Sequence, residues 1–492
     1  MSIQLPAEFA GMLPAVSGVD DPKTKRLISS PLIRFSEIIS ALSVALDITQ
    51  GNAPGHCMRT ALIGMRLADE LELSSADQSA LFYALLLKDL GCSSNAARFA
   101  SLFHTDDQRV KYSLRMIDWR NPVCNLKNVW SQCAPEAGPL EKLLKLAVLF
   151  RTGPAAARQV VEIRCERGAE IASMLRLPEA TSLAIRDLDE HWDGGGQPRG
   201  LKGEEISLLG RICGLAQTVE AFFSTQSLAA AFDIVEQRKS KWFDPSLVKA
   251  LRPLQHDAAF WQRLQGDDLI RQLADREPQE AILLADDNYL DCIAEAFSLV
   301  VDAKSPWTYK HSANVANIAA GLSEELGCTP EVVRDVRRAG LLHDIGKLGV
   351  SNLILDKPGK PTDEEFAQIR KHAEYSHRVL SQVPAFRELA EVAGGHHERL
   401  DGRGYHRGLA GAEIPFVTRI LTVADICEAL SASRPYRDSM PWEKIESILQ
   451  KDVSRAVDEE CFEALQRWQV SNPVTSRSED QAAAVDQVRS GL

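Results

Sequence analysis

The chain has 492 residues, 45% of them hydrophobic and 25% charged, a composition typical of soluble globular proteins and a length that predicts two or three domains. The net charge of −12 argues against non-specific binding to a nucleic acid polymer, because such binding depends on Lys and Arg at the phosphates. No stretch reaches the roughly 18 apolar residues of a membrane helix, no secretory leader is recognisable, and ten scattered cysteines indicate reduced thiols, so we expect a cytoplasmic protein away from membranes.

Apolar residues at helical spacing run through the whole chain. The segments 36–46, 56–71, 313–326 and 442–453 each place apolar side chains on one face of a helix. Alternating runs rich in Val, Ile and Thr, which would indicate strands, are scarce. We therefore predict an all-α fold.

An internal repeat relates the first half of the chain to the second. Residues 192–206 match residues 400–414 at 9 of 15 positions. The register also holds upstream, where the 32 residues between His311 and His343 recur between the equivalent positions of the first half. We interpret the chain as a tandem duplication whose first copy carries an insertion of 47 residues, at about residues 100–150.

The predicted domain boundaries follow from this repeat and from polar, Pro-containing stretches between the periodic segments. They give an N-terminal extension (1–29), a degenerate first copy (30–262), a linker (263–280), an intact second copy (281–470) and a polar C-terminal tail (471–492).

Histidines and acidic residues gather in the second copy. Seven of the eleven histidines lie between His311 and His406, in otherwise apolar helical segments. Such a density of imidazoles and carboxylates is typical of a buried multi-metal site. His377 and His406 have no role in the repeat pattern and are expected outside the ligand set. The predicted ligands are His311, His343, Asp344, His372, His396, His397 and Asp425.

The first copy lacks most of this set. A site made of imidazoles cannot be rebuilt from Lys, Arg, Leu and Gln, so we expect no comparable metal cluster there. Only His56 and Asp89 are retained. The positions of His343, His372, His396, His397 and Asp425 are occupied by Lys88, Arg164, Leu188, Asp189 and Gln217.

The position of Asp425 in the sequence argues most strongly for a metal. It interrupts the apolar stripe of residues 419–432, where an unpaired buried carboxylate would cost several kcal/mol. His343 and Asp344 end an amphipathic segment and are followed by glycines that break the helix, so both side chains can face one ion and the carboxylate can bridge two.

Three basic residues are candidates for contact with a phosphate. Lys347 lies one helical turn beyond His343, where an ammonium could stabilise charge on a phosphoryl oxygen. Arg434 and Arg437 follow Asp425 and offer fork-shaped donors. The first copy lacks both arginines as well as most of the metal ligands. This joint loss indicates that the arginines and the metal site act on the same substrate.

These motifs together resemble one known family. HDIGK (343–347), a single His at 372, HHExxDGxGY (396–405), an Asp-bearing helix and RPYR (434–437) resemble the HD-GYP subgroup of HD-domain phosphohydrolases. The resemblance covers about residues 285–470, and about 30–260 in degenerate form. It implies tandem HD-type helical domains, a site with two or three divalent ions, often iron or manganese, and hydrolysis of a cyclic dinucleotide, either cyclic di-GMP or a mixed cyclic GMP-AMP.

The resemblance also implies a role for each site residue. One ion would be held by His311, His343, Asp344 and Asp425, and the other by Asp344 with His372, His396 and His397. Asp344 and Lys347 would act in catalysis, while Arg434, Arg437 and Tyr405 would bind the substrate.

Two departures from the family pattern and two alternative functions stand beside this prediction. Trp307 stands where members with three metals carry a Glu, so we expect two metals, and the GYP signature reads Gly404-Tyr405-His406 here. The sequence leaves open an HD phosphohydrolase acting on another nucleotide, and a non-catalytic signalling adaptor. It also leaves open a homodimer, or a protein partner bound through the first copy or the GYH loop.

Overall fold

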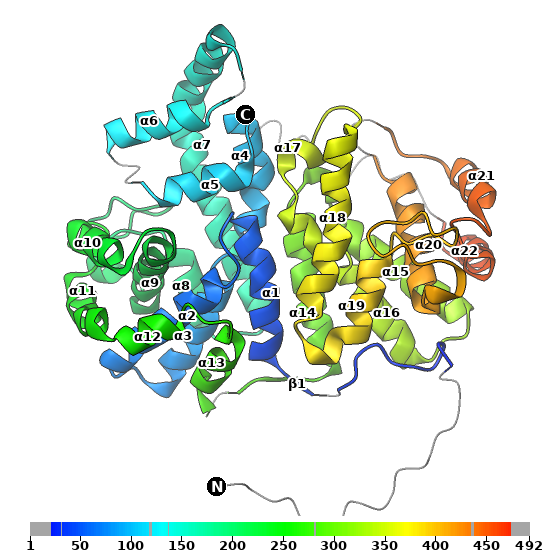
Figure 1. Ribbon diagram of the computed structural model, residues 1–492, viewed down its shortest axis with the longest axis horizontal. Helices are drawn as coiled ribbons and strands as arrows, with labels where there is room; N and C mark the ends of the chain where they lie inside the picture. Colours follow the sequence, from blue (N-terminus) through cyan, green and yellow to red (C-terminus); the bar gives the residue numbers. More distant parts are fainter. Residues whose placement is uncertain are drawn as a thin grey trace, which may run out of the picture.

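The computed structural model describes residues 21–473 apart from 31, 118–120, 136, 280–281 and 434–436. It is built from helices in two side-by-side halves, with one short antiparallel ribbon joining β1 (Ile33–Arg34) to β2 (Leu284–Ala285) (Figure 1). The prediction of an all-helical protein is confirmed. Among the helices described, none is long and apolar enough to cross a membrane.

The first half runs from β1 to α13. Its helices are α1 (Phe35–Thr49), α2 (His56–Glu70), α3 (Ser75–Leu87), η2 (Cys92–Asn95), α4 (Ala96–Phe103), α5 (Asp107–Arg115), α6 (Pro122–Gln132), α7 (Pro139–Met174), α8 (Glu179–Asp187), η3 (Gly203–Glu205), α9 (Leu208–Thr225), α10 (Leu228–Arg238), α11 (Pro245–Leu251), η4 (Arg252–His256), α12 (Ala258–Arg263) and α13 (Leu269–Arg276).

The second half runs from β2 to α22. Its helices are α14 (Asp287–Asp302), η6 (Pro306–Thr308), α15 (His311–Glu325), α16 (Pro330–Leu342), η7 (Ile345–Gly349), α17 (Asn352–Leu355), α18 (Asp363–Leu380), η8 (Pro384–Phe386), α19 (Arg387–Gly395), η9 (Gly411–Glu413), α20 (Phe416–Ser431), α21 (Trp442–Asp452) and α22 (Glu459–Ser471).

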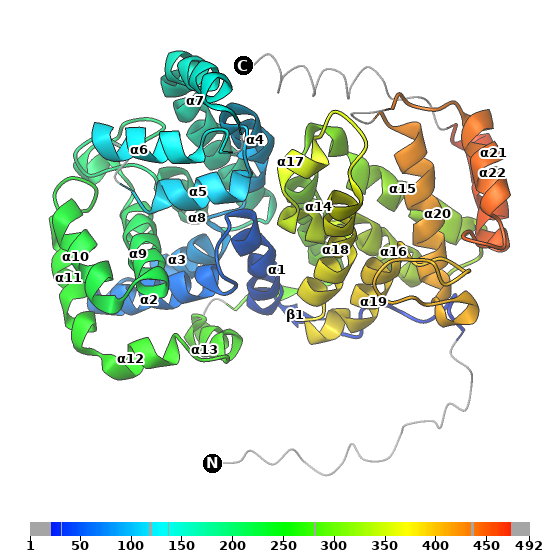
Figure 2. The same cartoon turned by 45° about the horizontal axis from the view of Figure 1, so that its top comes forward.

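One hydrophobic core extends through both halves. Helix α1 lies between them, as both views show (Figures 1 and 2). It packs on α18 and η7. The region predicted as an insertion forms α4, α5, α6 and the start of α7, and has a small core of its own that includes Phe103, Val110 and Val129. Part of the predicted linker is helical, because residues 269–276 form α13. This helix packs against α2. The exact domain boundaries stay predictions.

Local signals in the sequence account for the two helices that carry much of the site. Helix α18 begins with a capping box, in which Thr362 Oγ1 accepts a bond from the amide of Glu365 and the Glu365 carboxylate accepts one from the amide of Thr362. Helix α16 begins at Pro330, whose fixed φ suits a first helical turn. The apolar residues on one face of α16 are buried, and their packing places the helix against the core.

The start of the described chain is fastened to the second half. Asp335 on α16 is fully buried and accepts hydrogen bonds from the guanidinium groups of Arg26 and Arg338 and from the amides of Leu27 and Ile28. A carboxylate in that position balances two guanidinium groups, one of them almost completely buried. The segment 21–30 therefore belongs to the packing of the second half, although it precedes the first.

Replacing Asp335 by Ala should destabilise the protein strongly. Asp287 would still pair with both guanidinium groups, but their donors and two buried amides would lose the acceptor they share, so we expect the free energy of unfolding to fall by about 3 kcal/mol. Lys23→Ala is the control, because Lys23 and Glu460 form an exposed pair worth less than about 1 kcal/mol. Urea denaturation measures both, and equal effects would contradict the assignment.

Candidate metal centre

Five helices of the second half, α15, α16, α18, α19 and α20, meet around one buried point. Each contributes polar side chains from its end or its buried face. The glycines after Asp344 predicted a helix end at that residue, and the apolar stripe of residues 419–432 predicted that Asp425 is buried. His311 is the first residue of α15, His343 and Asp344 follow α16, His372 lies in α18, His396 and His397 follow α19, and Asp425 lies in α20.

Asp344 lies between two pairs of imidazoles. Its Oδ2 is 3.2 Å from Nε2 of both His311 and His343, whereas its Oδ1 is 3.3 Å from Nε2 of His372 and 3.9 Å from that of His396. The two oxygens of one carboxylate thus face different ligand groups. This is the placement that a carboxylate bridging two ions requires.

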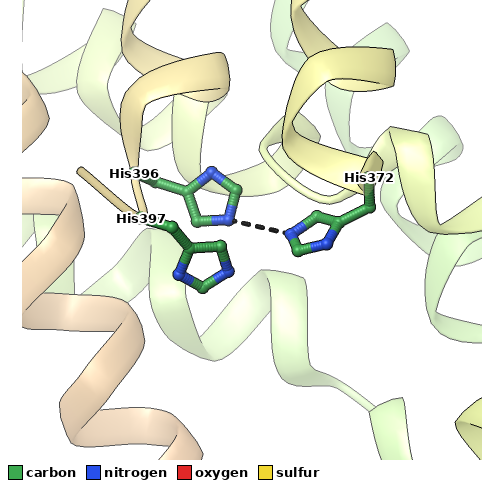
Figure 3. Close-up of side chains that lie close together, drawn as sticks. All are labelled: His372, His396 and His397. Atoms are coloured by element: carbon green, nitrogen blue, oxygen red, sulfur yellow. Dashed lines mark hydrogen bonds between the residues drawn. The ribbon is translucent and has the colours of Figure 1, made fainter. Parts of the chain in front are cut away.

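The remaining ligands complete both groups. Asp425 Oδ1 is 3.4 Å from His311 Nε2, and its Oδ2 is 3.8 Å from His397 Nδ1. His372, His396 and His397 turn toward one another, with 3.3 Å between the Nε2 atoms of the first two (Figure 3). The structure therefore brings all seven predicted ligands together, in overlapping groups whose ligand atoms lie within 4.8 Å of one another.

The protein orients four of these rings through their other nitrogen. Nδ1 of His343, His372 and His396 lies 2.7, 2.6 and 2.5 Å from the carbonyl oxygens of Gly340, Ile369 and Ala393, each three residues earlier in the chain. A ring that donates from Nδ1 to a carbonyl presents Nε2 as an unprotonated ligand. His311 uses a carboxylate instead, with Glu428 Oε2 at 2.5 Å from its Nδ1.

Several buried atoms at the centre have no hydrogen-bond partner among the described residues. They are Nε2 of His311, Nε2 of His343 and Oδ1 of Asp344. Buried polar atoms without partners are costly, and a cation would satisfy all three. The donor set of imidazole nitrogens and carboxylate oxygens suits a transition metal, so the residues fit a metal site.

Burial sets the charge state of some ligands, and neighbouring charges set that of others. It lowers the pKa of His372 to about 4 and that of His396 to about 3, which keeps these imidazoles neutral, as metal ligands must be. For His311, burial is outweighed by Glu428 and Asp344, which raise the pKa to about 10. Burial would also raise the pKa of Asp344, but His343 and Lys347 hold it well below its usual range. Asp344 is therefore an anion.

A glycine allows the loop after Asp344 to approach α18. A Cβ atom on Gly346 would lie 2.0 Å from the carbonyl oxygen of His372, far inside contact distance. The Gly346 amide also donates to Ser376 Oγ on the same helix. Any other residue would push η7 away from α18 and separate Asp344 from His372.

The predicted catalytic and substrate-binding residues have different positions. Lys347 Nζ forms an ion pair with Asp344 and so lies at the centre. The Tyr405 ring packs on His397 with 4.3 Å between centroids. Arg437 donates to the carbonyl oxygens of Ala429, at 2.5 Å, and of Leu430, at 2.9 Å, and thus covers the end of α20. Arg434 lies outside the described residues. The roles of all four remain predictions.

Comparison with known proteins agrees with this geometry. The family model named HD domain matches residues 152–247 and 295–461. A 3'3'-cGAMP-specific phosphodiesterase 3 of Vibrio cholerae serotype O1 is 43% identical over 436 residues, which cover 88% of this chain and 94% of the relative. The chain belongs to the HD-GYP family of HD domain proteins. The resemblance read from HDIGK, HHE and the DGxGY run is confirmed at the level of the family.

Two further similarities are to a relative that matches the second half and to a solved structure that supports the fold. A cyclic di-GMP phosphodiesterase of Thermotoga maritima is 36% identical over 179 residues, 35% of this chain and 49% of the relative. The crystal structure of V-cGAP3, a cyclic GMP-AMP specific phosphodiesterase of V. cholerae, matches with a TM-score of 0.63 at 37% identity, covering 90% of this chain and 99% of that one.

The HD-GYP signature loop is anchored by Glu398. Its carboxylate accepts hydrogen bonds from the amides of Arg407 and Leu409, at 3.1 Å each. Gly404 passes so close that a Cβ atom there would lie 2.5 Å from Glu398 Oε2. The loop with His406 in place of the family's Pro therefore keeps a fixed backbone path, which holds Tyr405 against His397. His377 pairs with Glu391 away from the centre.

Sequence reasoning missed Glu428, which contacts His311 from α20. The residue lies three positions after Asp425, on the same face of the helix. The signal was present in the repeat, because Glu220 holds the equivalent position after Gln217 in the first half. An acidic residue kept where the ligands are lost indicates a role in orienting the histidine.

Replacing Glu428 by Ala should weaken metal binding without removing a ligand. His311 would lose the carboxylate that fixes its ring, and such losses typically lower metal affinity by about 10–100-fold. Competition with a chelator measures the affinity, and Glu428→Gln, which keeps an acceptor, should restore part of it. Glu391→Ala is the matched control, since Glu391 pairs with His377 outside the centre. Equal effects in both variants would disprove this role.

Proposed function

We propose that the protein is a metal-dependent phosphodiesterase that opens a 3'3' cyclic dinucleotide at the Asp344 centre. The observation that carries the proposal is the position of Asp344, whose two oxygens face separate pairs of imidazoles. The 43% identity to a relative named as 3'3'-cGAMP-specific, over 88% of the chain, favours the mixed guanine-adenine substrate over cyclic di-GMP.

Two divalent ions, iron or manganese, would be held by this donor set. His311, His343 and Asp425 lie on the side of Asp344 Oδ2, and His372, His396 and His397 on the side of Oδ1. When bound, such ions activate water for attack on the phosphodiester and neutralise the charge of the transition state. Trp307 in place of the family's additional Glu supports two ions rather than three.

Side chains at the edge of the centre would bind and position the substrate. Lys347 is held by Asp344, and its ammonium group can stabilise charge on a phosphoryl oxygen. The guanidinium carbon of Arg370 lies 4.7 Å from the ring centroid of Tyr405, and the same group donates to the carbonyl of Gly404. Arg370 and Tyr405 together offer a cationic and aromatic surface for a nucleotide beside the ligands.

Hydrolysis by the metal-loaded protein tests this proposal. Purified protein loaded anaerobically with manganese or iron should convert 3'3'-cGAMP to a linear product, which chromatography detects, faster than it converts cyclic di-GMP. His343→Ala removes a ligand and should lower kcat/KM roughly a thousandfold or more. His377→Ala should keep the activity, because His377 lies outside the centre.

Three results would contradict parts of the proposal. Metal-loaded protein that cleaves no cyclic dinucleotide would favour the adaptor alternative. Faster cleavage of another nucleotide in the same assay would favour a different HD phosphohydrolase. Full turnover in His343→Ala would disprove the assignment of the site.

The first half is best explained as a degenerate copy of the second, and contacts at equivalent positions support this part of the proposal. His56 begins α2 and its Nδ1 contacts Glu220, just as His311 begins α15 and contacts Glu428. Both acids lie in the helix that would carry the last ligand, α9 in one half and α20 in the other.

The close approach of a glycine loop to a helix also recurs. A Cβ atom on Gly91 would lie 1.9 Å from the carbonyl oxygen of Arg164, as one on Gly346 would lie 2.0 Å from that of His372. The loop after the conserved Asp therefore has the same packing in each half. A glycine is therefore required at this position in the first half too, although the metal ligands are absent there.

Lys88 supplies the positive charge in the first half. Its Nζ forms an ion pair with Asp89 and lies 3.0 Å from His56 Nε2, and all three side chains are buried. An ammonium group thus stands among the two retained ligands. A buried carboxylate matched in this way needs no metal ion.

Metal content should depend on the second half alone. His56→Ala should bind as much manganese as the unaltered protein, measured by elemental analysis after desalting, because Lys88 already balances Asp89. His343→Ala should lose metal. Loss of metal in His56→Ala would contradict the proposal that the first half is degenerate.

A further inference from the structure

A large cavity lies in the first half, with a volume of about 740 Å³. Its lining includes Arg164, Leu188, Asp189 and Gln217, the residues that stand at four of the lost ligand positions. The cavity therefore occupies the place of the metal centre in the second half. Its volume is within the range of small-molecule binding sites.

The region predicted as an insertion forms part of the wall of this cavity. Helices α4 and α5 contribute Phe99, Phe103, Lys111 and Arg115 to the lining, and the start of α7 contributes Leu149. These residues have no counterpart in the second half, since that half lacks the segment. The insertion has supplied new aromatic and basic walls where the ligands were lost.

The lining is more basic than acidic. Five basic side chains line the cavity, Lys111, Arg115, Arg164, Arg211 and Arg238, against three acidic ones.

The three acids of the lining already have partners. Asp189 pairs with Arg164, Asp244 pairs with Arg211, and Glu190 accepts bonds from two backbone amides. Arg164 and Arg211 are therefore neutralised within the lining, and Lys111 pairs with Asp107. The charge of Arg115 is not matched by an ion pair with any carboxylate of the described residues. An anionic ligand would be attracted to it.

Arg115 is the side chain best placed to receive that anion. Its guanidinium is held by neutral acceptors, Asn52 Oδ1 at 2.6 Å and Gln50 Oε1 at 2.9 Å, and lies 3.5 Å from His56 Nε2. Within the part of the chain that the structure describes, no carboxylate lies within ion-pair distance of it. Arg115 is thus positioned in advance beside the lost metal site.

The lining contains buried hydrogen-bond donors and buried acceptors that have no partner among the described residues. Nε of Arg164 and Nε of Arg211 are donors without an acceptor among the described residues, and Oε1 of Gln217 and Oδ1 of Asn95 are acceptors without a donor. A phosphate would satisfy the guanidinium groups, and the N–H groups of a purine would satisfy the amide oxygens. Phe99 and Phe103 add aromatic surface for a base.

We propose that this cavity binds a purine nucleotide through Arg115 and that its occupancy is transmitted by α5 to the catalytic half. The first part depends on the cavity alone. The second part rests on the phosphodiesterase activity proposed above.

Helix α5 joins the cavity to the loop that carries Lys347. Arg115 ends α5 in the cavity, while residues at its start bind the second half: Gln108 Nε2 donates to the carbonyl of Leu348 in η7, at 3.2 Å, and Asp107 pairs with Lys304 at 3.0 Å. Leu348 directly follows Lys347 in the chain. A shift of α5 on binding would therefore act on the residue next to Lys347 in the chain.

A second set of bonds makes this contact rigid. Asp106 Oδ1 accepts a bond from Ser351 Oγ at 3.0 Å, and Asp107 Oδ1 accepts one from the amide of Asn352 at 3.3 Å. Asp107 and Lys304 are fully buried, so this is not a surface contact. The start of α5 and the segment 348–352 should move together.

Binding can be measured without any hydrolysis. Full-length His343→Ala protein without added metal is titrated by calorimetry with GMP, AMP, guanosine and inorganic phosphate. We expect saturable binding of GMP or AMP, with phosphate and guanosine each binding more weakly. Arg115→Gln should weaken that binding roughly tenfold or more, because a charged hydrogen-bond donor is lost.

Two further variants make the result decisive. Gln217→Glu, nearly equal in shape, should also weaken binding, because it places a carboxylate in the cavity; thermal unfolding shows whether each variant is folded. Arg167→Gln, on the exposed side of α7 beside Glu170, should bind as before. No binding of either nucleotide, binding unchanged in Arg115→Gln and Gln217→Glu, or phosphate binding as tightly as GMP would each overturn the nucleotide site.

Transmission to the catalytic half requires a separate measurement on the manganese-loaded protein. Saturating nucleotide should change cyclic dinucleotide turnover roughly fivefold or more, in the usual range of coupling between sites. Arg115→Gln should abolish the change, which separates it from product inhibition at the catalytic centre. Gln108→Ala should keep nucleotide binding but reduce the change. Unaltered turnover at saturation would overturn the coupling while leaving the binding result intact.

Discussion

A single buried negative charge governs the architecture of this protein. The carboxylate of Asp344 lies where five helices meet, almost without access to water, and burial makes an unmatched charge there very costly. Helix α15 begins at this point, α16 and α19 end there, and α18 and α20 pass beside it, so that imidazoles and the Lys347 ammonium surround the carboxylate. In the first half the same charge, on Asp89, is matched by the ammonium of Lys88. The two halves thus present two solutions to one electrostatic requirement. Among the described residues, ligand atoms of His311, His343 and Asp344 lack hydrogen-bond partners, whereas those of His56 and Asp89 have them.

Much of the centre could be predicted because its residues conflict with their local pattern. Asp425 in an apolar helix and the imidazoles at helix ends are improbable without a ligand, and the altered first half showed which positions change together. The contacts of Arg437 were harder to predict, because the sequence does not show that its guanidinium group donates to carbonyl oxygens of α20. Glu428 resembled any acidic residue on a helix, although its retention as Glu220 carried the information.

The cavity of the first half lay beyond sequence reasoning for a different reason. Helical periodicity predicts that α4, α5 and α7 exist, but it does not fix the direction in which an inserted segment folds back. That direction depends on tertiary contacts, such as the pair of Asp107 with Lys304, which are 197 residues apart. Loss of metal ligands looked like loss of function in the sequence. In the structure four of these substituted residues line a cavity, to which they contribute basic, acidic, amide and apolar groups.

The attachment of residues 21–30 to α16 has a consequence for the way the chain is made. Arg26 leaves the ribosome 309 residues before Asp335, its partner in the second half. At usual rates of synthesis this is an interval of roughly 15 to 60 s. During that time the first half can form its own helices, but the segment before it has nothing to bind and must stay available. Residues 21–30 can therefore pack in their final position only after the helices of the second half have been made. Cutting the chain between its halves would separate two parts of one core.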